Sequence, residues 1–137
     1  MDGANLLKVY RTVILPSVEY CAEIYDSLIP QYMSDKLESV QRQAVKIMFG
    51  LGRRVEEIME KEGIETLKVR RTRACLAFAN RALSTEYGRR WFPRSQITRE
   101  ARSTTRRTFE EIKPRTERDK NNPIQHMIRL LNLQSSG

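Results

Sequence analysis

The sequence predicts an all-α protein, a small bundle of five or six helices with a basic C-terminal half. Apolar residues recur at spacings of three and four along most of the 137 residues, which is the period of an amphipathic helix. No stretch of useful length alternates apolar and polar residues as a half-buried strand would. The length and the 39% hydrophobic content favour one domain over residues 1–137.

The N-terminal region predicts two helices separated by a proline. Residues 5–14 place apolar side chains on one helical face. Pro16 lacks an amide donor and clashes with the preceding turn, so we expect the first helix to end or kink before it. A second helix is expected over 17–28, with Cys21 on its apolar side. The tyrosines predicted in the core are Tyr10, Tyr20 and Tyr25.

The central element is expected over residues 37–50. Ser34 is a candidate N-cap, and Gly50 stands where a helix commonly ends. Polar residues occupy the opposite face, so this helix should be amphipathic. The residues predicted on its buried stripe are Leu37, Val40, Ala44, Ile47 and Met48.

Two helices are predicted after the central one. A short helix over 55–61 should stop at Gly63, and a longer helix should run over 66–83. Gly88 then breaks the helical pattern. Both segments would add apolar stripes to the shared core.

The last third of the chain has a weaker pattern. Residues 89–121 are strongly basic with few apolar positions, so we expect this region to be rich in loops, with one helix over 98–112. Pro123 suits the first position of a final helix, and Asn122 is its natural N-cap. The buried side of that helix is predicted to comprise Ile124, Met127, Ile128 and Leu131.

Few residues suit catalysis or metal binding. Cys21 and Cys75 are the only cysteines; a disulfide is one interpretation, and two reduced core thiols are the favoured one. The single histidine, His126, has no Cys or His at metal-ligand spacing, so we expect neither zinc nor another cofactor, and we expect His126 on a helix surface. No P-loop or nucleophilic triad is evident. The clustered glutamates over 56–62 are interpreted as a solvated face, and no catalytic residue is predicted.

Charge is distributed unevenly along the chain. Residues 1–63 carry 8 Lys and Arg against 10 Asp and Glu, a balance of −2, whereas residues 64–137 carry 17 against 7, a balance of +10. Such an excess favours a polyanionic partner, and arginine suits phosphate through its planar fork. A solvated basic surface is the alternative. The predicted nucleic-acid-binding residues are Lys68, Arg70, Arg71, Arg73 and Arg81, with Arg89, Arg90 and Arg94 as an outer rim.

Trp91 and Phe92 lie between Arg90 and Arg94 in the sequence. They could stack on bases, as aromatic residues of single-strand binders do. The favoured interpretation is a hydrophobic anchor that holds a loop to the core.

Several motifs together resemble a known family. The residues at 7–20, with Ile14-Leu15-Pro16-Ser17-Val18-Glu19-Tyr20, are similar to a segment of LINE-type (non-LTR) retrotransposon reverse transcriptases that follows the palm. Residues 37–44, LESVQRQA, resemble the LExVQRRA helix of that family, with Gln43 where arginine is frequent. Residues 63–71 match its GLxxLxxRR pattern, and the terminal Asn-Pro-Ile…Met…Leu-Asn pattern is also similar.

The resemblance implies the helical thumb and post-thumb region of a reverse transcriptase, which holds the template–primer duplex by its backbone. It brings no catalytic residues, because the palm motif is missing from this sequence. The expected function is therefore non-catalytic, sequence-tolerant binding of RNA, DNA or an RNA–DNA duplex, with the palm as a further partner. The alternative is a protein–protein interaction or structural module that docks on an acidic partner. No apolar run would span a bilayer, and we expect an intracellular location, in nucleus or cytoplasm.

Overall fold

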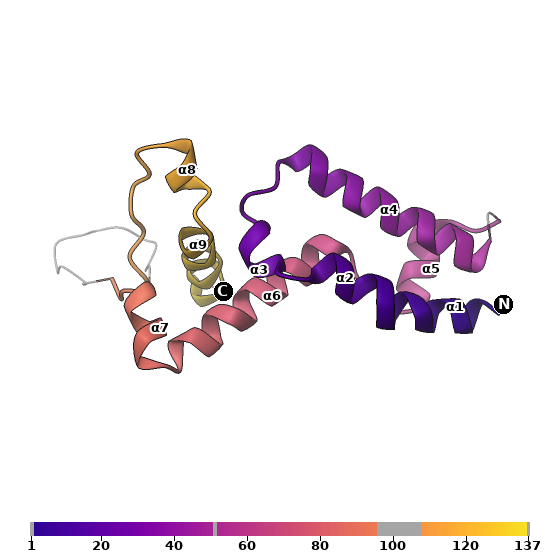
Figure 1. Cartoon of the computed structure of the whole chain (residues 1–137), viewed down its shortest axis with the longest axis horizontal. Coiled ribbons are helices and arrows are strands. Elements are labelled where there is room, and N and C mark those ends of the chain that lie inside the picture. Colours follow the sequence, from indigo (N-terminus) through magenta and orange to yellow (C-terminus); the bar gives the residue numbers. More distant parts are fainter. Residues whose placement is uncertain (1, 51, 96–107, 137) are drawn as a thin grey trace. The chain divides into compact units, whose positions relative to one another are not determined.

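The computed structural model describes residues 2–50, 52–95 and 108–136. These residues are predominantly helical, and no β-strand forms among them, so the predicted all-α class is confirmed (Figure 1). Five helices have seven or more residues, which matches the predicted five or six. The shorter ones lie partly in the N-terminal region, where a predicted helix is divided, and partly at 86–91 and 117–120, where no helix was predicted.

The chain divides into two compact units. Residues 1–22 and 29–71 form the first unit; residues 23–28 and 72–137 form the second unit. The prediction of one domain over residues 1–137 stays a prediction. The elements are α1 Gly3–Val9, η1 Tyr10–Ile14, α2 Leu15–Glu19, α3 Ala22–Tyr25, α4 Gln31–Phe49, α5 Val55–Lys61, α6 Leu67–Leu83, α7 Glu86–Trp91, α8 Glu117–Lys120 and α9 Pro123–Ser136.

The N-terminal helix does not end before Pro16. The backbone continues from α1 into α2 through the π-helical turn η1, in which the Leu15 N–H donates to the carbonyl of Tyr10. Proline is tolerated in the first turn of a helix, where its missing N–H has no partner to lose, and the wider π turn lets α2 begin there. The expected break lies later, where Cys21 adopts a φ of 56°. Tyr20 beside it is 78% exposed, so its predicted place in the core is wrong, and Cys21 is also exposed.

The central helix α4 differs from its prediction in both start and face. It begins at Gln31, so Ser34 lies within the helix and is buried instead of capping it. Val40 and Ile47 are 60% and 70% exposed, contrary to the predicted stripe. Gln41 is buried in their place, because its side-chain amide donates to the carbonyl of Glu65 at 3.0 Å.

The first unit is held together by two groups of buried apolar residues. One joins the N-terminal helices to the start of α6 through Leu7, Tyr10, Leu15 and Leu67. Tyr10 thus occupies the core position predicted for it. The other group joins α4 to α5 through Val45, Val55 and Ile58. The helix over 55–61 is confirmed with its predicted bounds.

The second unit packs α6, α7 and α9 around one core. Its buried residues are Cys75, Ala79, Phe92, Phe109, Met127, Ile128 and Leu131. The long helix over 66–83 is confirmed as α6, and its residues from 72 onward belong to this unit. Gly88 does not break the helical pattern but lies buried within α7. A Cβ atom there would lie 2.1 Å from the carbonyl oxygen of Ala82, so the close approach of the two backbones requires glycine.

The basic segment before α9 is only partly described. Residues 98–107 of the helix expected over 98–112 lie outside the described residues, and residues 108–112 are not helical. Phe109 instead forms an isolated antiparallel bridge with Arg94. The Asn132 amide binds both the N–H and the carbonyl of Phe109, at 2.9 and 3.1 Å, and thereby holds this segment on α9.

The final helix forms as predicted, with one exception. Asn122 caps α9 by accepting a hydrogen bond from the Ile124 N–H at 2.9 Å. The predicted side of α9 faces the core, where Met127, for example, is 2% exposed. His126 is not a surface residue of the expected kind: it is half-buried, and its Nε2 lies 3.0 Å from a carboxylate oxygen of Asp26.

None of the helices in the described ranges has both the length and the apolarity to cross a bilayer.

Candidate nucleic-acid interface

The predicted phosphate-binding residues divide between the two units. Lys68, Arg70 and Arg71 lie in the first unit at the start of α6, whereas Arg73, Arg81, Arg89, Arg90 and Arg94 belong to the second unit. The structure gives the two groups different surroundings, which changes the set of residues that could meet a phosphate.

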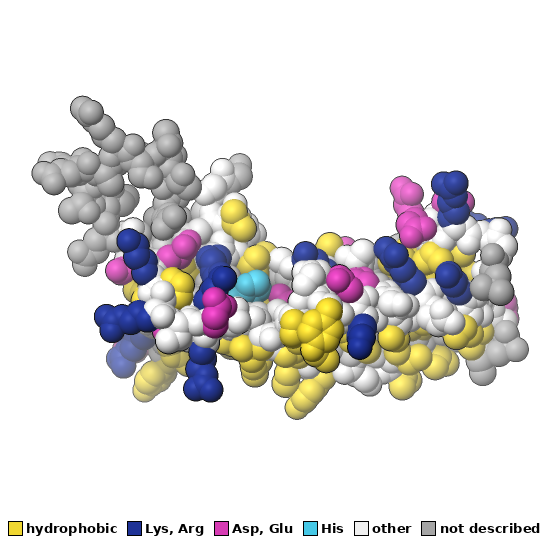
Figure 2. All heavy atoms as spheres, turned by 90° about the horizontal axis from the view of Figure 1, so that it is seen from above, with side chains coloured by type: hydrophobic (Ala, Val, Ile, Leu, Met, Phe, Trp, Pro, Cys, Tyr) yellow, Lys and Arg dark blue, Asp and Glu magenta, His cyan; other side chains and the backbone are white. Residues whose placement is uncertain are grey.

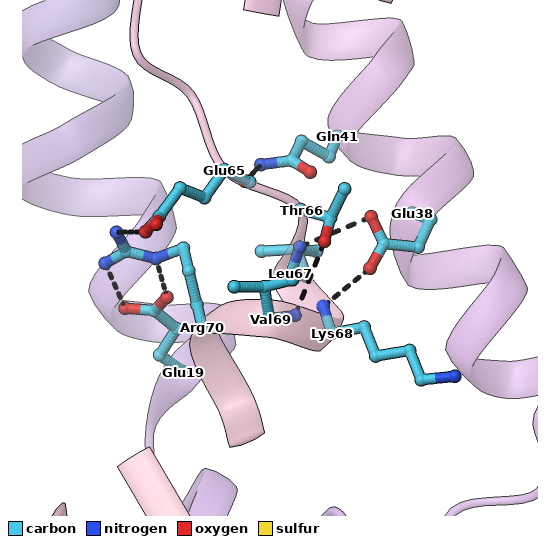
Figure 3. Close-up of polar contacts among 9 residues, drawn as sticks. All are labelled: Glu19, Glu38, Gln41, Glu65, Thr66, Leu67, Lys68, Val69 and Arg70. Carbon is cyan, nitrogen blue, oxygen red and sulfur yellow. Dashed lines mark hydrogen bonds and ion pairs between the residues drawn. The ribbon is translucent and has the colours of Figure 1, made fainter. Parts of the chain in front are cut away.

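The start of α6 is organised by Glu38 of α4 (Figure 3). Its carboxylate accepts hydrogen bonds from the backbone N–H groups of Leu67 and Lys68, at 3.3 and 2.7 Å. These are first-turn donors that have no partner within the helix, and a negative charge there also suits the helix dipole. A carboxylate of the protein itself thus occupies this helix end.

Arg70 is engaged by carboxylates of its own unit. Its Nε and Nη2 donate to the two oxygens of Glu19, the second at 2.9 Å, and Nη1 lies 3.9 Å from Glu65 (Figure 3). The hydrogen bonds to Glu19 raise the pKa of Arg70 above its ordinary value. Such a bidentate pair uses the fork of donors that phosphate recognition needs. Arg70 therefore cross-links elements of the first unit, and its predicted contact with phosphate stays a prediction.

Arg71 lies inside the first unit. Its side chain is among the largest fully buried ones, and Nη2 donates to the Ser34 hydroxyl at 2.6 Å. A guanidinium buried in this way does not reach a phosphate at the surface. The predicted contact of Arg71 with phosphate stays a prediction, and its burial speaks against it. Of the three predicted residues in this unit, Lys68 alone has an exposed side chain.

The five predicted binding residues of the second unit are exposed. Arg73 and Arg81 lie on α6, Arg89 and Arg90 on α7, and Arg94 follows α7. Figure 2 shows Lys and Arg side chains projecting from the surface of this part of the chain. Arg90 lies 3.7 Å from Glu86 in an ion pair whose side chains are 71% and 78% exposed. A pair that exposed contributes little to stability, so Arg90 can exchange it for a phosphate at small cost.

Two exposed aromatic residues accompany the arginines of α7. Tyr87 and Trp91 are 75% and 51% exposed, and four residues apart they share one face of the helix. The Arg90 guanidinium lies over the Tyr87 ring, 5.6 Å from its centre. We call Tyr87, Arg89, Arg90 and Trp91 the α7 surface. Sequence reasoning missed Tyr87, although its spacing from Trp91 was a usable signal.

The α7 surface rests on a firmly held helix. Thr85 caps α7, since its hydroxyl accepts a hydrogen bond from the Gly88 N–H at 3.0 Å. Phe92 is 2% exposed and packs edge-on against Phe109, with ring centres 6.5 Å apart. The predicted hydrophobic anchor is therefore Phe92 alone. Trp91 stays outside the core, where its ring is accessible to a partner.

The clustered glutamates of α5 lie at the surface. Glu56, Glu57 and Glu60 are exposed, and Glu56 lies 4.0 Å from Arg42 in a pair at the surface. This arrangement is that of a solvated helix face, as the sequence indicates.

Comparisons of the chain with protein-family models, with curated proteins and with solved structures find no match.

Proposed function

We propose that this chain is a non-catalytic nucleic-acid-binding module that contacts single-stranded RNA or DNA, or the backbone of a duplex, without reading sequence. The observation that carries the proposal is the α7 surface, where two exposed aromatic rings flank exposed arginines. Single-strand binders combine these two groups: cationic side chains neutralise phosphates while aromatic rings stack on bases. Phosphate and stacking contacts position a nucleic acid but carry little sequence information.

The charge balance supports the same function. The net charge of the chain is +8, and the exposed arginines on α6 and α7 add to the attraction of a polyanion. The resemblance to the thumb of non-LTR reverse transcriptases, whose role is to hold a template–primer backbone, is in agreement. On this proposal the binding residues are Arg73, Arg81, Arg89, Arg90 and Arg94, with Lys68 as a separate contact and with Tyr87 and Trp91 added.

Binding is tested by titrating the chain with a single-stranded oligonucleotide at several salt concentrations. Trp91 is the only tryptophan, so its fluorescence reports on the α7 surface alone. We expect quenching on binding, and an affinity that falls linearly with log salt, by about 0.7 in slope for each phosphate contacted on a single strand. A flat salt dependence, or binding without any change in Trp91 fluorescence, would contradict the proposal.

Matched variants separate the contacts from a general effect of charge. Arg90→Gln should lower the salt slope by about one phosphate equivalent, whereas Arg53→Gln, which removes the same charge from an exposed residue of the first unit, should not. Trp91→Ala should weaken binding about 5- to 150-fold through lost stacking. Tyr32→Ala removes an aromatic side chain that is 61% exposed on α4, and it should leave the affinity unchanged.

A second candidate function rests on exposed aliphatic residues of the first unit. Val13, Val40 and Ile47 are 59%, 60% and 70% exposed, although they belong to helices with well-packed opposite sides. Exposed aliphatic residues of this kind suit a protein partner. Size-exclusion chromatography distinguishes the candidates, because self-association that is unaffected by added RNA favours a protein-interaction module.

A further inference from the structure

Three potential metal ligands meet in the second unit. They are the carboxylate of Asp26, the thiol of Cys75 and the imidazole of His126, and their ligand atoms all lie within 4.8 Å of one another. The residues come from three distant parts of the sequence, which is why spacing along the chain predicted no metal. The described structure brings together donors that the sequence keeps apart.

Each ligand is positioned by a separate element of the same unit. Asp26 directly follows α3, Cys75 lies in α6, and His126 lies in the first turn of α9. The Asn122 cap fixes where α9 starts, and the His126 N–H donates to the Asn122 carbonyl at 3.0 Å. Two hydrogen-bonded contacts already link the elements: His126 to Asp26 at 3.0 Å, and the Cys75 thiol to the Glu23 carbonyl at 4.0 Å.

The burial of the cluster is graded. Cys75 is fully buried in the core of the unit, whereas the side chains of Asp26 and His126 are 12% and 27% exposed. A metal ion could therefore enter from the side of His126 and bind the thiolate at the inner end of the cluster. Water would reach the same side.

The ligand chemistry selects the class of metal. Sulfur, imidazole nitrogen and carboxylate oxygen together suit zinc, whereas magnesium and calcium prefer oxygen ligands alone. Around zinc, with bonds of about 2.0–2.3 Å, tetrahedral ligands lie about 3–4 Å apart. The present separations, all within 4.8 Å, exceed that range by little.

We propose that Asp26, Cys75 and His126 bind one zinc ion, with a water molecule in the fourth position. On binding, the Cys75 thiol gives its proton to solvent and coordinates as thiolate, and no electron is transferred. The ion would cross-link the segment after α3 to α6 and α9. This site is separate from the α7 surface and does not depend on the proposed nucleic-acid binding.

Cobalt(II) is the probe for this site, because a thiolate ligand gives it a charge-transfer band in the near ultraviolet. We expect the full chain to bind one equivalent and to show that band, and to lose it when urea unfolds the protein. The matched control is Cys21→Ser, which removes the exposed thiol and leaves Cys75 as the only cysteine. The band should persist in Cys21→Ser and vanish in Cys75→Ser.

Two further variants test the other ligands without removing the buried thiol. His126→Gln and Asp26→Asn should each weaken cobalt binding by more than about tenfold. Zinc should raise the urea midpoint of the Cys21→Ser chain and leave that of Cys21→Ser combined with His126→Gln unchanged. The proposal is overturned if the Cys21→Ser chain shows no charge-transfer band at saturating cobalt, or if His126→Gln binds as tightly as the native sequence. If Cys75→Ser fails to fold, the band in Cys21→Ser still assigns the thiolate.

Discussion

The carboxylate of Glu19 binds the guanidinium of Arg70 through two hydrogen bonds, across 51 positions of sequence. This pair joins α2 to the start of α6 within the first unit. Hydrogen bonds between charged groups contribute about 1.5–3 kcal/mol when they are partly shielded from water, as these are. The pair therefore stabilises the fold at a position where sequence reasoning placed a phosphate contact.

Replacing either member of this pair should destabilise the first unit. We expect Arg70→Ala and Glu19→Ala each to lower the free energy of unfolding by about 1–3 kcal/mol, and the double variant to lose less than the sum. Urea denaturation of the four proteins measures the coupling. Arg70→Ala should also leave the salt slope of oligonucleotide binding unchanged. A salt slope reduced by about one phosphate equivalent would instead show that Arg70 contacts a phosphate of the bound oligonucleotide.

Glu38 should matter for stability more than other surface carboxylates do. Glu38→Ala leaves the Leu67 and Lys68 N–H groups at the start of α6 without their acceptor, so we expect a loss of about 0.5–2 kcal/mol in the free energy of unfolding. Glu60→Ala is the control, since Glu60 is an exposed carboxylate on α5 of the same unit. Equal effects of the two substitutions in urea denaturation would show that the cap contributes nothing specific.

Substitution of Gly88 tests whether stability depends on the close approach of α7 to α6. Gly88→Ala places a methyl group 2.1 Å from the Ala82 carbonyl oxygen, and backbone atoms of both helices must move to relieve the clash. We expect a loss of about 1–3 kcal/mol in the free energy of unfolding, as for other overpacked sites. Gly52→Ala should have little effect, because a Cβ atom there meets nothing within 4 Å. Thermal unfolding followed by circular dichroism compares the two variants.

Tyr10 should make stability fall at high pH. Burial raises the pKa of Tyr10 above its ordinary value of 10.0, against opposing contributions from Gln41 and Arg70. Above pH 10 the tyrosine of the unfolded chain loses its proton while that of the folded chain keeps it, so the unfolded state binds fewer protons and unfolding becomes easier. This contribution is complete below pH 10 and is lost as the pH rises through the folded-state pKa.

Between pH 9 and pH 11 the free energy of unfolding should fall less in Tyr10→Phe than in the native sequence, because the variant lacks the phenol that loses its proton. Tyr20→Phe is the matched control, because the Tyr20 side chain is 78% exposed. Urea denaturation at several pH values measures both. A pH dependence that Tyr10→Phe leaves intact would assign the effect to other groups.

The sequence by itself determined where most helices lie. The spacing of apolar residues located α5, α6 and α9 closely, and Asn122 with Pro123 marked the start of α9. These features depend on side-chain periodicity and on capping, which act over a few neighbouring residues. The uneven distribution of charge along the chain was also evident from the sequence, because it requires only a count of the charged residues.

The tertiary structure alone decided which polar residues are structural. Gln41 and Arg71 are buried, and each donates a hydrogen bond to a partner distant in sequence, the Glu65 carbonyl and the Ser34 hydroxyl respectively. The same holds for His126 and Asp26, which meet across 100 positions of sequence. A periodic pattern records how apolar a face is, but it does not say which distant group will neutralise a buried charge or accept its hydrogen bond. Packing makes that choice, and so it separates the arginines that stabilise this fold from those that remain exposed to a partner.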